Sequence, residues 1–588
     1  MVLRDIKKAW RSLQTDGFAR TAKKAARKLK YGSGGGQYAA FIQKYEPSRA
    51  ELALQKKTQF ANMPKISFLC PAYNTKPEFA KAMIQSVLVQ TYANWELVIA
   101  DAGEEKTCSQ ALKTLAKADG RVRYLRLQEN LGIALNTAEA AEAASGEIFA
   151  FLDHDDTLAP FAAFELAKAV NEHSEADFFY SDEDKMDNLG RFDPHFKPKW
   201  SPDTLKSYNY ITHLMAMTKA LYVRCGGMRP GYDGSQDHDL ALRATEMANQ
   251  IVHIPKVLYH WRAHKGSVAG NGAAKSYANE AGLKAAEWAA KSENEEARAE
   301  QGLFRNSYRV RYPLAKQPKV SVVIPNRDAV ELLRPCVETV LATKEESSLE
   351  LIVVENGSKQ PEIFDYYRQL EQSGQAKIVR FEGAFNYSAA NNLGARHASG
   401  DLLLFLNNDV QAMEPGWLTA MAEHAKRPTV GAVGAKLLFS DGSIQHAGVV
   451  VGMNGWADHV CAGLPADGGG RFAASHLVNT VRNVSAVTGA CMMVEKSKFD
   501  VAGGFDEGFI LCGSDVEFCL RLLSLGFVNI YTPFACLKHL ESVTRKGSPI
   551  PESDFARSKE AYAPYLASGD PYYSVNYDYQ SKLPRIKP

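Results

Sequence analysis

Three carboxylates stand close together directly after an apolar run. Phe149-Ala-Phe-Leu152 follows a Ser-Gly turn and is succeeded by Asp153, Asp155 and Asp156. An apolar run of this length bounded by a turn is typical of a buried strand, and ligands of open α/β sheets bind beyond the carboxyl ends of the strands. Because unpaired buried acids are costly, we expect these side chains to face a hard cation such as Mg²⁺ that also contacts substrate phosphates.

The same arrangement occurs a second time further along the chain. Ser399-Gly400 precedes Leu403-Leu-Phe-Leu406, and Asp409 stands 254 residues after Asp155, as Gly400 stands 254 residues after Gly146. A constant offset of this size predicts a tandem duplication.

Strand-like and helix-like segments alternate in both copies. We expect strands at 65–70, 95–100 and 122–127 in the first copy and at 319–324 and 349–354 in the second. This alternation predicts an α/β fold in which each copy is a mostly parallel sheet with helices on both faces. The expected parts are a basic helical segment (1–60), a first domain (61–270), a helical linker (271–316), a second domain (317–545) and a tail (546–588).

Composition excludes several classes of protein. The chain has 588 residues, is 45% hydrophobic and carries a formal net charge of only +2, which argues against a nucleic-acid partner. Its nine cysteines form no Cys-x-x-Cys pair, which favours reduced thiols over a zinc site or a disulfide framework. No apolar run is long enough to span a bilayer, and the beginning lacks the apolar core of a signal peptide. We therefore expect a cytoplasmic protein.

Residues 1–30 differ in charge from the rest of the chain. They contain ten basic and two acidic residues, a local net charge of +8, and Val2, Ile6, Trp10 and Leu13 recur at helical spacing. A basic amphipathic helix of this kind suits an anionic membrane surface. The alternative is a helix that packs on the protein's own body with its charges in water.

The order of the motifs resembles a known family. The first copy contains, in this order, Pro71-Ala-Tyr-Asn74, a strand ending at Asp101, Asn130-Leu-Gly132, Leu152-Asp-His-Asp-Asp156, Gly226-Gly-Met228 and Gln236-Asp-His-Asp-Leu240. This set resembles the GT-A fold (Rossmann-like) glycosyltransferases of the large inverting family 2. Phe385-Asn-Tyr-Ser388 and Leu406-Asn-Asn-Asp409 in the second copy resemble rhamnosyltransferase-like members, and Tyr180–Lys185 resembles members that build bacterial surface polysaccharides such as O-antigen.

The resemblance implies a cation-dependent transfer of sugars. The donor would be a nucleotide-diphosphate sugar such as a UDP- or dTDP-sugar, and Mg²⁺ or Mn²⁺ would neutralise the leaving diphosphate. The metal-binding aspartates would be Asp155 and Asp409. Asp153 and, as a departure from the family pattern, Asn407 stand where the family contacts the ribose or the metal.

One histidine late in each copy completes the implied metal site. They are His264 and His539, with His260 as the competing choice in the first copy. A neutral imidazole is a suitable ligand beside a carboxylate.

Each copy also offers a carboxylate for proton transfer. Asp237 and Asp515 match the family's base at the start of a helix, where Gln236 and Ser514 replace the family's Glu. A carboxylate in hydrogen-bond reach of the acceptor hydroxyl can take its proton. Simple helix capping is the alternative role.

The nucleotide-binding loops differ between the copies. The residues that match the base-binding loop and strand end are Pro71, Tyr73, Asn74 and Asp101 in the first copy, and Pro325, Arg327, Asp328 and Glu355 in the second. We interpret the chain as a bifunctional inverting glycosyltransferase at the inner face of the plasma membrane. It would elongate a lipid-linked or oligosaccharide acceptor, and it could form a homo-oligomer.

Two other functions stay open at this point. In the first, one active domain is joined to a degenerate copy that only binds glycan or nucleotide. In the second, the chain is a nucleotide-binding oxidoreductase. The second requires a Gly-x-Gly-x-x-Gly turn after the first strand, and Pro71-Ala-Tyr-Asn74 and Pro325-Asn-Arg-Asp328 stand there instead.

Overall fold

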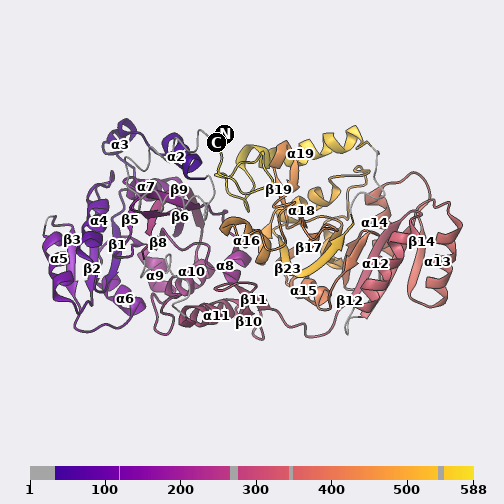
Figure 1. The fold of residues 1–588 in the computed structure, drawn as a ribbon, viewed down its shortest axis with the longest axis horizontal. Helices are drawn as coiled ribbons and strands as arrows, with labels where there is room; N and C mark the ends of the chain where they lie inside the picture. Colours follow the sequence, from indigo (N-terminus) through magenta and orange to yellow (C-terminus); the bar gives the residue numbers. More distant parts are fainter. Residues whose placement is uncertain (1–33, 118, 265–275, 344–347, 541–548) are drawn as a thin grey trace, which may run out of the picture. The chain divides into compact units, whose positions relative to one another are not determined.

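The computed structural model describes residues 34–117, 119–264, 276–343, 348–540 and 549–588, and it divides into two compact units (Figure 1). The first unit contains the chain up to Trp200, Asn209–Ala285 and Ile586–Pro588, and the second contains Ser201–Tyr208 and Ala286–Arg585. The predicted basic helix at 1–30 lies outside the described residues. No described helix combines the length and the apolar character needed to cross a membrane.

The first unit is built on a nine-stranded sheet in the order β3-β2-β1-β4-β8-β6-β9-β5, with β7 paired to β6. Its strands are β1 (Ile66–Ala72), β2 (Trp95–Asp101), β3 (Val122–Arg126), β4 (Ile148–Phe151), β5 (Thr157–Leu158), β6 (Phe178–Asp187), β7 (Gly190–His195), β8 (Met215–Thr218) and β9 (Ile251–Arg262). Strands β3, β2, β1 and β4 are parallel, whereas β8 runs antiparallel to both of its neighbours. The C-terminal end of β4 therefore meets the N-terminal end of β8.

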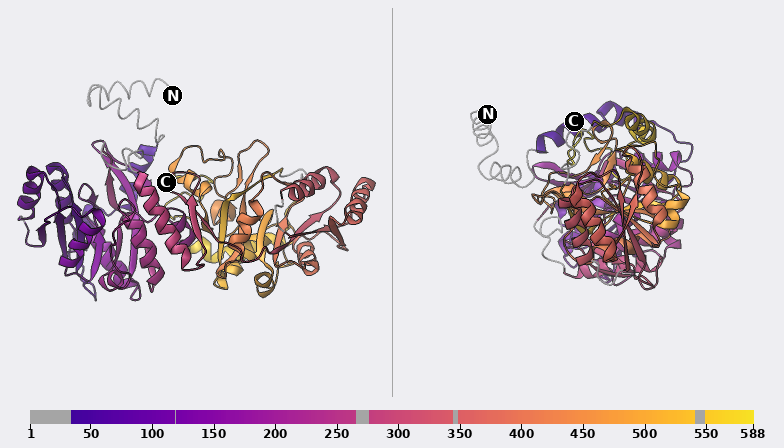
Figure 2. Two further views of the ribbon diagram at one scale, coloured as in Figure 1. Left: turned by 90° about the horizontal axis from the view of Figure 1, so that it is seen from below. Right: turned by 90° about the vertical axis from the view of Figure 1, so that its right-hand side faces the viewer.

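Helices surround this sheet (Figure 2). They are α2 (Gly34–Tyr45), α3 (Arg49–Gln55), α4 (Pro77–Leu88), α5 (Lys106–Ala116), α6 (Ile133–Ala143), α7 (Ala162–Glu172), α9 (Lys219–Arg224) and α10 (Gln236–Met247), followed by α11 (Ser276–Lys291), which runs on into the second unit. Helix α4 buries Ala80, Met83, Ile84 and Val87, at the spacing of one helix face, in the core formed by β1, β2 and β4.

The second unit repeats this architecture. Its ten-stranded sheet has the order β14-β13-β12-β15-β22-β17-β23-β16, which matches the first unit strand for strand. The strands are β12 (Lys319–Asn326), β13 (Ser348–Glu355), β14 (Ala376–Arg380), β15 (Leu402–Leu406), β16 (Val410–Ala412), β17 (Val430–Leu438), β18 (Ile444–His446), β21 (Arg482–Val484), β22 (Cys491–Glu495) and β23 (Val528–His539). Both the α/β class and the tandem GT-A fold predicted from the sequence are thus confirmed.

Further elements complete the second unit. Its helices are α8 (Pro202–Ser207), α12 (Val330–Ala342), α13 (Pro361–Gln372), α14 (Tyr387–His397), α15 (Trp417–Ala425), η1 (Met453–Gly455), α16 (Phe472–Asn479), α17 (Lys496–Val501), α18 (Ser514–Ser524) and α19 (Glu552–Ser568). Two small antiparallel sheets pair β10 (Arg298–Gln301) with β11 (Tyr308–Arg311) and β19 (Val449–Val451) with β20 (Ala457–His459).

The units do not divide at the boundaries expected from the sequence. Helix α8, inside the expected first domain, belongs to the second unit because Asp203 is buried there against Arg427 at 2.7 Å and accepts a hydrogen bond from Asn483 at 2.8 Å. The nearby guanidinium lowers the pKa of Asp203. The expected tail contains a 17-residue helix, α19, and its chain up to Arg585 is part of the second unit.

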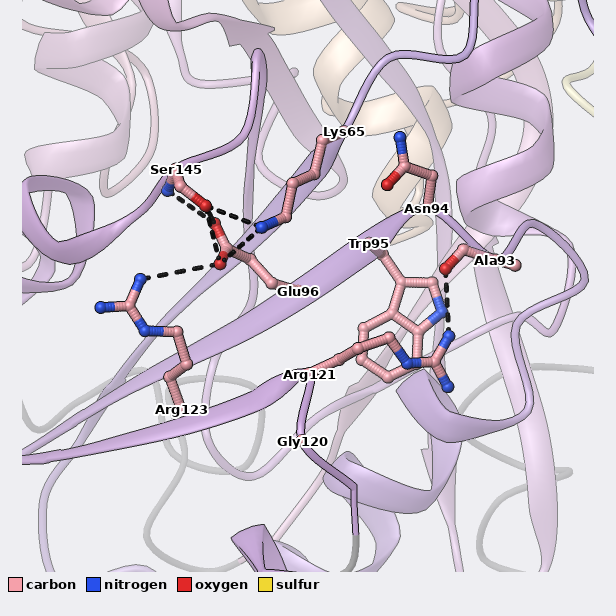
Figure 3. Close-up of a pocket in the computed structure, with 9 residues that line it drawn as sticks. All are labelled: Lys65, Ala93, Asn94, Trp95, Glu96, Gly120, Arg121, Arg123 and Ser145. Atoms are coloured by element: carbon pink, nitrogen blue, oxygen red, sulfur yellow. Dashed lines mark hydrogen bonds and ion pairs between the residues drawn. The ribbon is translucent and has the colours of Figure 1, made fainter.

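A polar network recurs in each sheet at the N-terminal ends of the parallel strands, opposite the acidic C-terminal ends. In the first unit the buried Glu96 carboxylate accepts hydrogen bonds from Lys65 at 3.1 Å and the Ser145 backbone at 2.6 Å (Figure 3). It also accepts one from the Ser67 hydroxyl at 2.7 Å. Each partner has a counterpart 254 residues later, where Glu350 is bonded by Ser321 and Ser399. These bonds hold the pKa of Glu96 down to about 2, although burial acts to raise it. The network fixes the N-terminal ends of the strands, and the acidic side chains lie at the opposite, C-terminal ends.

Candidate active sites

The acidic strand end of the first unit contains two kinds of carboxylate. Asp156 is fully buried and accepts hydrogen bonds from the Tyr259 hydroxyl and the Arg262 backbone, both at 2.7 Å. Burial, with the charges of Asp155 and Asp153, raises the pKa of Asp156 well above its ordinary value. The side chains of Asp153 and Asp155 are 36% and 20% exposed. They are therefore the carboxylates that a ligand could reach.

The structure places His264 against Asp155. The His264 Nε2 atom lies 2.7 Å from the Asp155 Oδ2 atom, just beyond the end of β9. The competing His260 is directed elsewhere, with its Nδ1 atom 2.7 Å from a carboxylate oxygen of buried Asp184. Of the two histidines considered from the sequence, His264 is the one at the acidic strand end.

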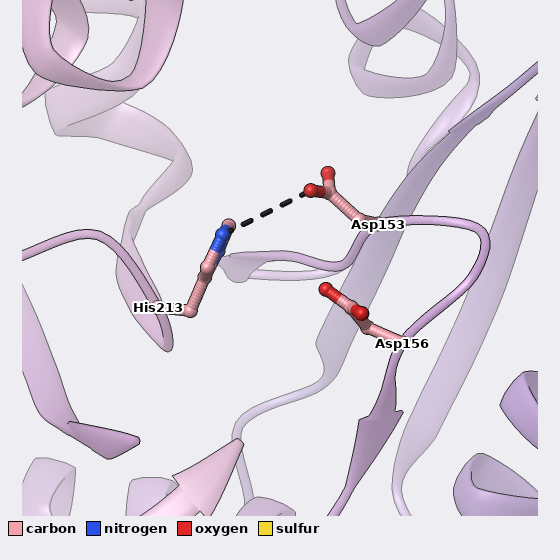
Figure 4. A group of neighbouring side chains, drawn as sticks. All are labelled: Asp153, Asp156 and His213. Atoms are coloured by element: carbon pink, nitrogen blue, oxygen red, sulfur yellow. Dashed lines mark ion pairs between the residues drawn. The ribbon is translucent and has the colours of Figure 1, made fainter. Parts of the chain in front are cut away.

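His213 is a member of this site that sequence reasoning missed. Its Nε2 atom lies 3.8 Å from an Asp153 carboxylate oxygen (Figure 4), and Asp153, Asp156 and His213 each present one ligand atom within 4.8 Å of the others. The ring stacks on Tyr259 at a centroid distance of 4.4 Å. Its backbone N–H donates to Glu183 at 2.9 Å. The sequence feature that could have identified His213 was its place two residues before β8, the antiparallel neighbour of the acidic strand.

Asp237 lies at the start of α10 and has a partner for one oxygen. Asn209 donates a hydrogen bond to the Asp237 Oδ2 atom at 2.8 Å. Burial raises the pKa of Asp237, His213 acts to lower it, and Asp153 acts to raise it. Asn209 also accepts the backbone N–H of Thr212, the residue before His213, at 3.1 Å, so the candidate base lies near the acidic strand end. The neighbouring Asp239 is instead used by Arg229 and Arg243.

The predicted nucleotide loop of the first unit is held by its own side chains. Asn74 has a left-handed backbone (φ 47°), and its Oδ1 atom accepts the N–H groups of residues 104 and 105 at 2.8 and 2.9 Å. Asp101 is 1% exposed and accepts hydrogen bonds from Gly103 and Tyr124. Pro71 is buried in β1, whereas Tyr73 is 40% exposed. Tyr73 is thus the loop side chain that offers a free surface.

The second loop follows the same plan with different residues. Asp328 replaces Asn74, keeps the left-handed backbone (φ 52°) and accepts the N–H groups of Lys359 and Gln360 at 2.6 and 2.9 Å. Glu355 replaces Asp101, is buried, and accepts from Ser358 and from the Tyr367 hydroxyl. Arg327 is exposed at the position of Tyr73, and Pro325 is half-buried in β12.

His539 also lies next to Asp409, the acid predicted for it, but its position in the fold differs from that of His264 in the first unit. Its Nε2 atom is 3.2 Å from an oxygen of Asp409. His539 is the last residue of β23 and pairs with Val410, so in strand register it corresponds to Trp261 and not to His264. Both Asp409 and His539 are buried, and the Asp409 Oδ1 and His539 Nδ1 atoms have no hydrogen-bond partner in the described structure.

The two sites differ in a pair of facing residues. The Asn407 N–H donates to the Ala490 carbonyl at 3.0 Å, and the register of β15 with β22 makes Ala490 the counterpart of His213. Asn407 is the counterpart of Asp153 at the same offset. The second unit therefore replaces both members of the Asp153–His213 pair. Its candidate base, Asp515, starts α18 and accepts the Gly489 N–H at 2.8 Å.

Comparison with known proteins identifies the family of the chain. The family model described as glycosyl transferase family 2 matches residues 67–229 and 321–448. The chain is 39% identical over 542 residues to the O-antigen biosynthesis protein RfbC of Myxococcus xanthus, and this match covers 91% of the chain and 42% of that protein. They are 39% identical over 533 positions to the uncharacterized protein y4gI of Sinorhizobium fredii, which covers 89% of this chain and 58% of that protein. The chain thus spans about half the length of these relatives.

Similarity to solved structures is weaker. A crystal structure of GalNAc-T7 with UDP, GalNAc and Mn²⁺ is 17% identical, with a TM-score of 0.36 over 44% of this chain and 51% of that one. The sequence matches and the strand order repeated in both units together carry the identification. The chain belongs to glycosyl transferase family 2, with two tandem GT-A domains.

Proposed function

We propose that each unit is a glycosyltransferase that moves a sugar from a nucleoside-diphosphate donor to a hydroxyl of a growing bacterial surface polysaccharide. One observation carries this proposal, and it is the same in both units. A carboxylate and a histidine meet beyond the end of the fourth strand, β4 or β15. An aspartate lies in the first turn of the helix before the last long strand, α10 or α18. The chemistry needs these two functions, one for the diphosphate and one for the acceptor proton.

The residues present fit a divalent cation. In the second unit, His539 Nδ1 is a buried polar atom without a hydrogen-bond partner among the described residues, and Asp409 Oδ1 has only the contact with His539 Nε2 at 3.2 Å. Such an arrangement is costly unless a ligand satisfies it. In the first unit, Asp155 and His264 would hold the ion, and the Asp153–Asp156–His213 group lies beside them. Mg²⁺ or Mn²⁺ bound there would supply positive charge to the leaving diphosphate.

The residues of the chain then account for the transfer. Asp237 accepts the proton of the acceptor hydroxyl, and Asn209 keeps its carboxylate oriented. The acceptor oxygen forms a bond to the anomeric carbon while the bond from that carbon to the diphosphate oxygen breaks, and the electron pair leaves with the nucleoside diphosphate. Attack from the face opposite the leaving group inverts the anomeric centre. Asp515 takes the same role in the second unit.

The loops support two different specificities. Tyr73 is an exposed aromatic that could stack on a donor base, whereas Arg327 at the same place offers a cation. UDP- and dTDP-sugars are the donors that we propose, and the acceptor is a lipid-linked or free oligosaccharide. The basic residues at 1–30 would hold the enzyme at the inner face of the plasma membrane.

A panel of UDP- and dTDP-sugars, with release of the nucleoside diphosphate as the readout, tests this proposal. We expect the full chain to release product from two donors. Asp237→Asn should remove one activity and Asp515→Asn the other, with chelator removing both. If neither variant reduces product release, the proposed sites are wrong.

A second candidate function has specific support. The replacement of Asp153, His213 and Asp156 by Asn407, Ala490 and Val410 leaves the second unit with fewer ionisable groups. This favours a second unit that binds a nucleotide sugar or glycan without turning it over. The two alternatives are distinguished by Asp515→Asn, since a binding copy loses no transfer activity when its candidate base is removed.

A further inference from the structure

The loop that leads to Asp515 is held by a helix from the C-terminal part of the second unit. Residues Phe509–Gly513 precede α18, and the first turn of α19 contains Asp554, which is 1% exposed. Its carboxylate accepts three consecutive backbone N–H groups. They come from Ile510 at 2.9 Å, Leu511 at 2.8 Å and Cys512 at 3.0 Å.

These three bonds fix the last residues before the base. Cys512 is followed by Gly513, which has a left-handed backbone (φ 92°), and then by the first residue of α18. A Cβ atom on Gly513 would lie 2.7 Å from the Ser558 hydroxyl oxygen of α19, so the loop and the helix are in close contact. The side chain on the adjoining turn, Asp515, has its Oδ2 atom bonded to the Gly489 N–H at 2.8 Å.

We propose that Asp554 is a positioning residue for the second transfer: by binding the N–H groups of residues 510–512 it sets the start of α18 and with it the Asp515 carboxylate. This inference rests on the proposed role of Asp515 as the base. Hydrogen bonds to a charged group are stronger than those between neutral groups. One carboxylate that serves three adjacent donors therefore determines the path of this loop.

The first unit makes the corresponding contact with fewer bonds. Helix α11 follows the last strand of the first sheet as α19 follows that of the second, and it lies against the residues before α10. There the Ser235 hydroxyl donates to the Ala278 carbonyl at 2.7 Å. The contact of Asp554 with the backbone N–H groups of residues 510–512 is a feature of the second unit, and it lies outside the residues that match the family model.

Asp554→Asn tests the proposal in the full chain. The amide retains one acceptor but points an N–H₂ group at backbone donors, so the loop must shift. A misplacement of about 1 Å can reduce a rate by about 10²-fold, and we expect kcat of the second transfer to fall by about 10- to 100-fold. The KM for the donor, the binding of UDP and dTDP with Mn²⁺, and the first transfer should stay within about twofold, since they use other residues.

Two further variants sharpen the test. Asp554→Glu restores a carboxylate and should recover part of kcat. Arg557→Gln removes an exposed ion pair between the same helix and Asp506, which lies shortly before the loop, and it should leave both transfers unchanged.

Three results are informative in different ways. An Asp554→Asn enzyme with unchanged kcat overturns the proposal. A parallel loss of kcat, nucleotide binding and melting temperature also overturns it, because that is a folding effect. If Asp554→Asn does not fold, Asp554→Glu takes its place in the test. Its carboxylate lies one methylene further from the backbone, so a full wild-type kcat in this variant overturns the proposal as well. If Asp515→Asn leaves the second transfer running, the proposed function of the second unit fails whatever Asp554 does.

Discussion

Replacing Asp237 by Asn removes the proposed proton acceptor of the first site and little else. The amide oxygen can still accept the hydrogen bond that Asn209 now donates at 2.8 Å, so the side chain keeps its place. General-base catalysis contributes about 10²–10⁴-fold to such reactions, which corresponds to about 2.7–5.4 kcal/mol of activation free energy. We expect kcat of the first transfer to fall by this factor with the donor KM nearly unchanged.

The pH dependence gives this prediction a second signature. Only the ionised carboxylate can accept the proton, and burial raises the pKa of Asp237 above its ordinary value. The wild-type rate should therefore fall, as the pH is lowered, at a higher pH than an ordinary aspartate would give. His213 acts to lower this pKa, so His213→Gln should move the acid limb to still higher pH. Asn209→Ala should move it in the same direction, because the lost hydrogen bond favoured the carboxylate.

The assay is initial-rate release of the nucleoside diphosphate between acid and neutral pH, with the second transfer in the same chain as the internal control. Asp239→Asn is unsuitable as a control because Asp239 is buried and paired with Arg243. If Asp237→Asn retains a rate within about threefold of wild type, far less than a lost base predicts, and keeps the acid limb, the base is another group and the reasoning is refuted.

Further predictions concern the cation, the stability and the membrane. Chelation should abolish both transfers and added Mn²⁺ restore them, and Asp155→Asn or Asp409→Asn should weaken Mn²⁺ binding measured by calorimetry; full turnover in excess chelator would contradict this. Asp203→Ala leaves the buried Arg427 short of a partner and should cost about 3 kcal/mol of unfolding free energy in denaturant titrations at neutral pH. The loss should diminish as the pH falls through the lowered pKa of Asp203, and an unchanged midpoint would contradict the pairing. Deletion of residues 1–30 should release the protein from anionic vesicles, since each basic residue near such a surface contributes about 1 kcal/mol; co-sedimentation as strong as that of the full chain would exclude this segment as the anchor.

The sequence predicted the parts of the site that are local in the chain. An apolar run followed by carboxylates identifies a strand end, and an acid at the start of a helix identifies a candidate base, because both signals occupy a few adjacent residues. The repeat at 254 residues then predicted the second copy of the fold. These elements appear in the structure where the sequence placed them.

Residues whose role depends on strand order or distant packing were not predictable in this way. His213 faces Asp153 only because β8 runs antiparallel to β4. Asp554 contacts a loop 42 to 44 residues earlier in the chain. The register of His539 required the pairing of β16 with β23. Each depends on long-range pairing, which no local pattern of residue types encodes.

The paired replacement in the second unit bears on whether that unit is active. Here Asn407 and Ala490 stand where Asp153 and His213 stand in the first unit, and Val410 stands where Asp156 does, so two carboxylates and the facing imidazole are absent together. Asp409 and Asp515 still stand at the strand end and the helix start, and His539 contacts Asp409 from another register position. A site that exchanges a facing pair while it keeps its acid, histidine and base is better explained by a change of donor or acceptor than by loss of function.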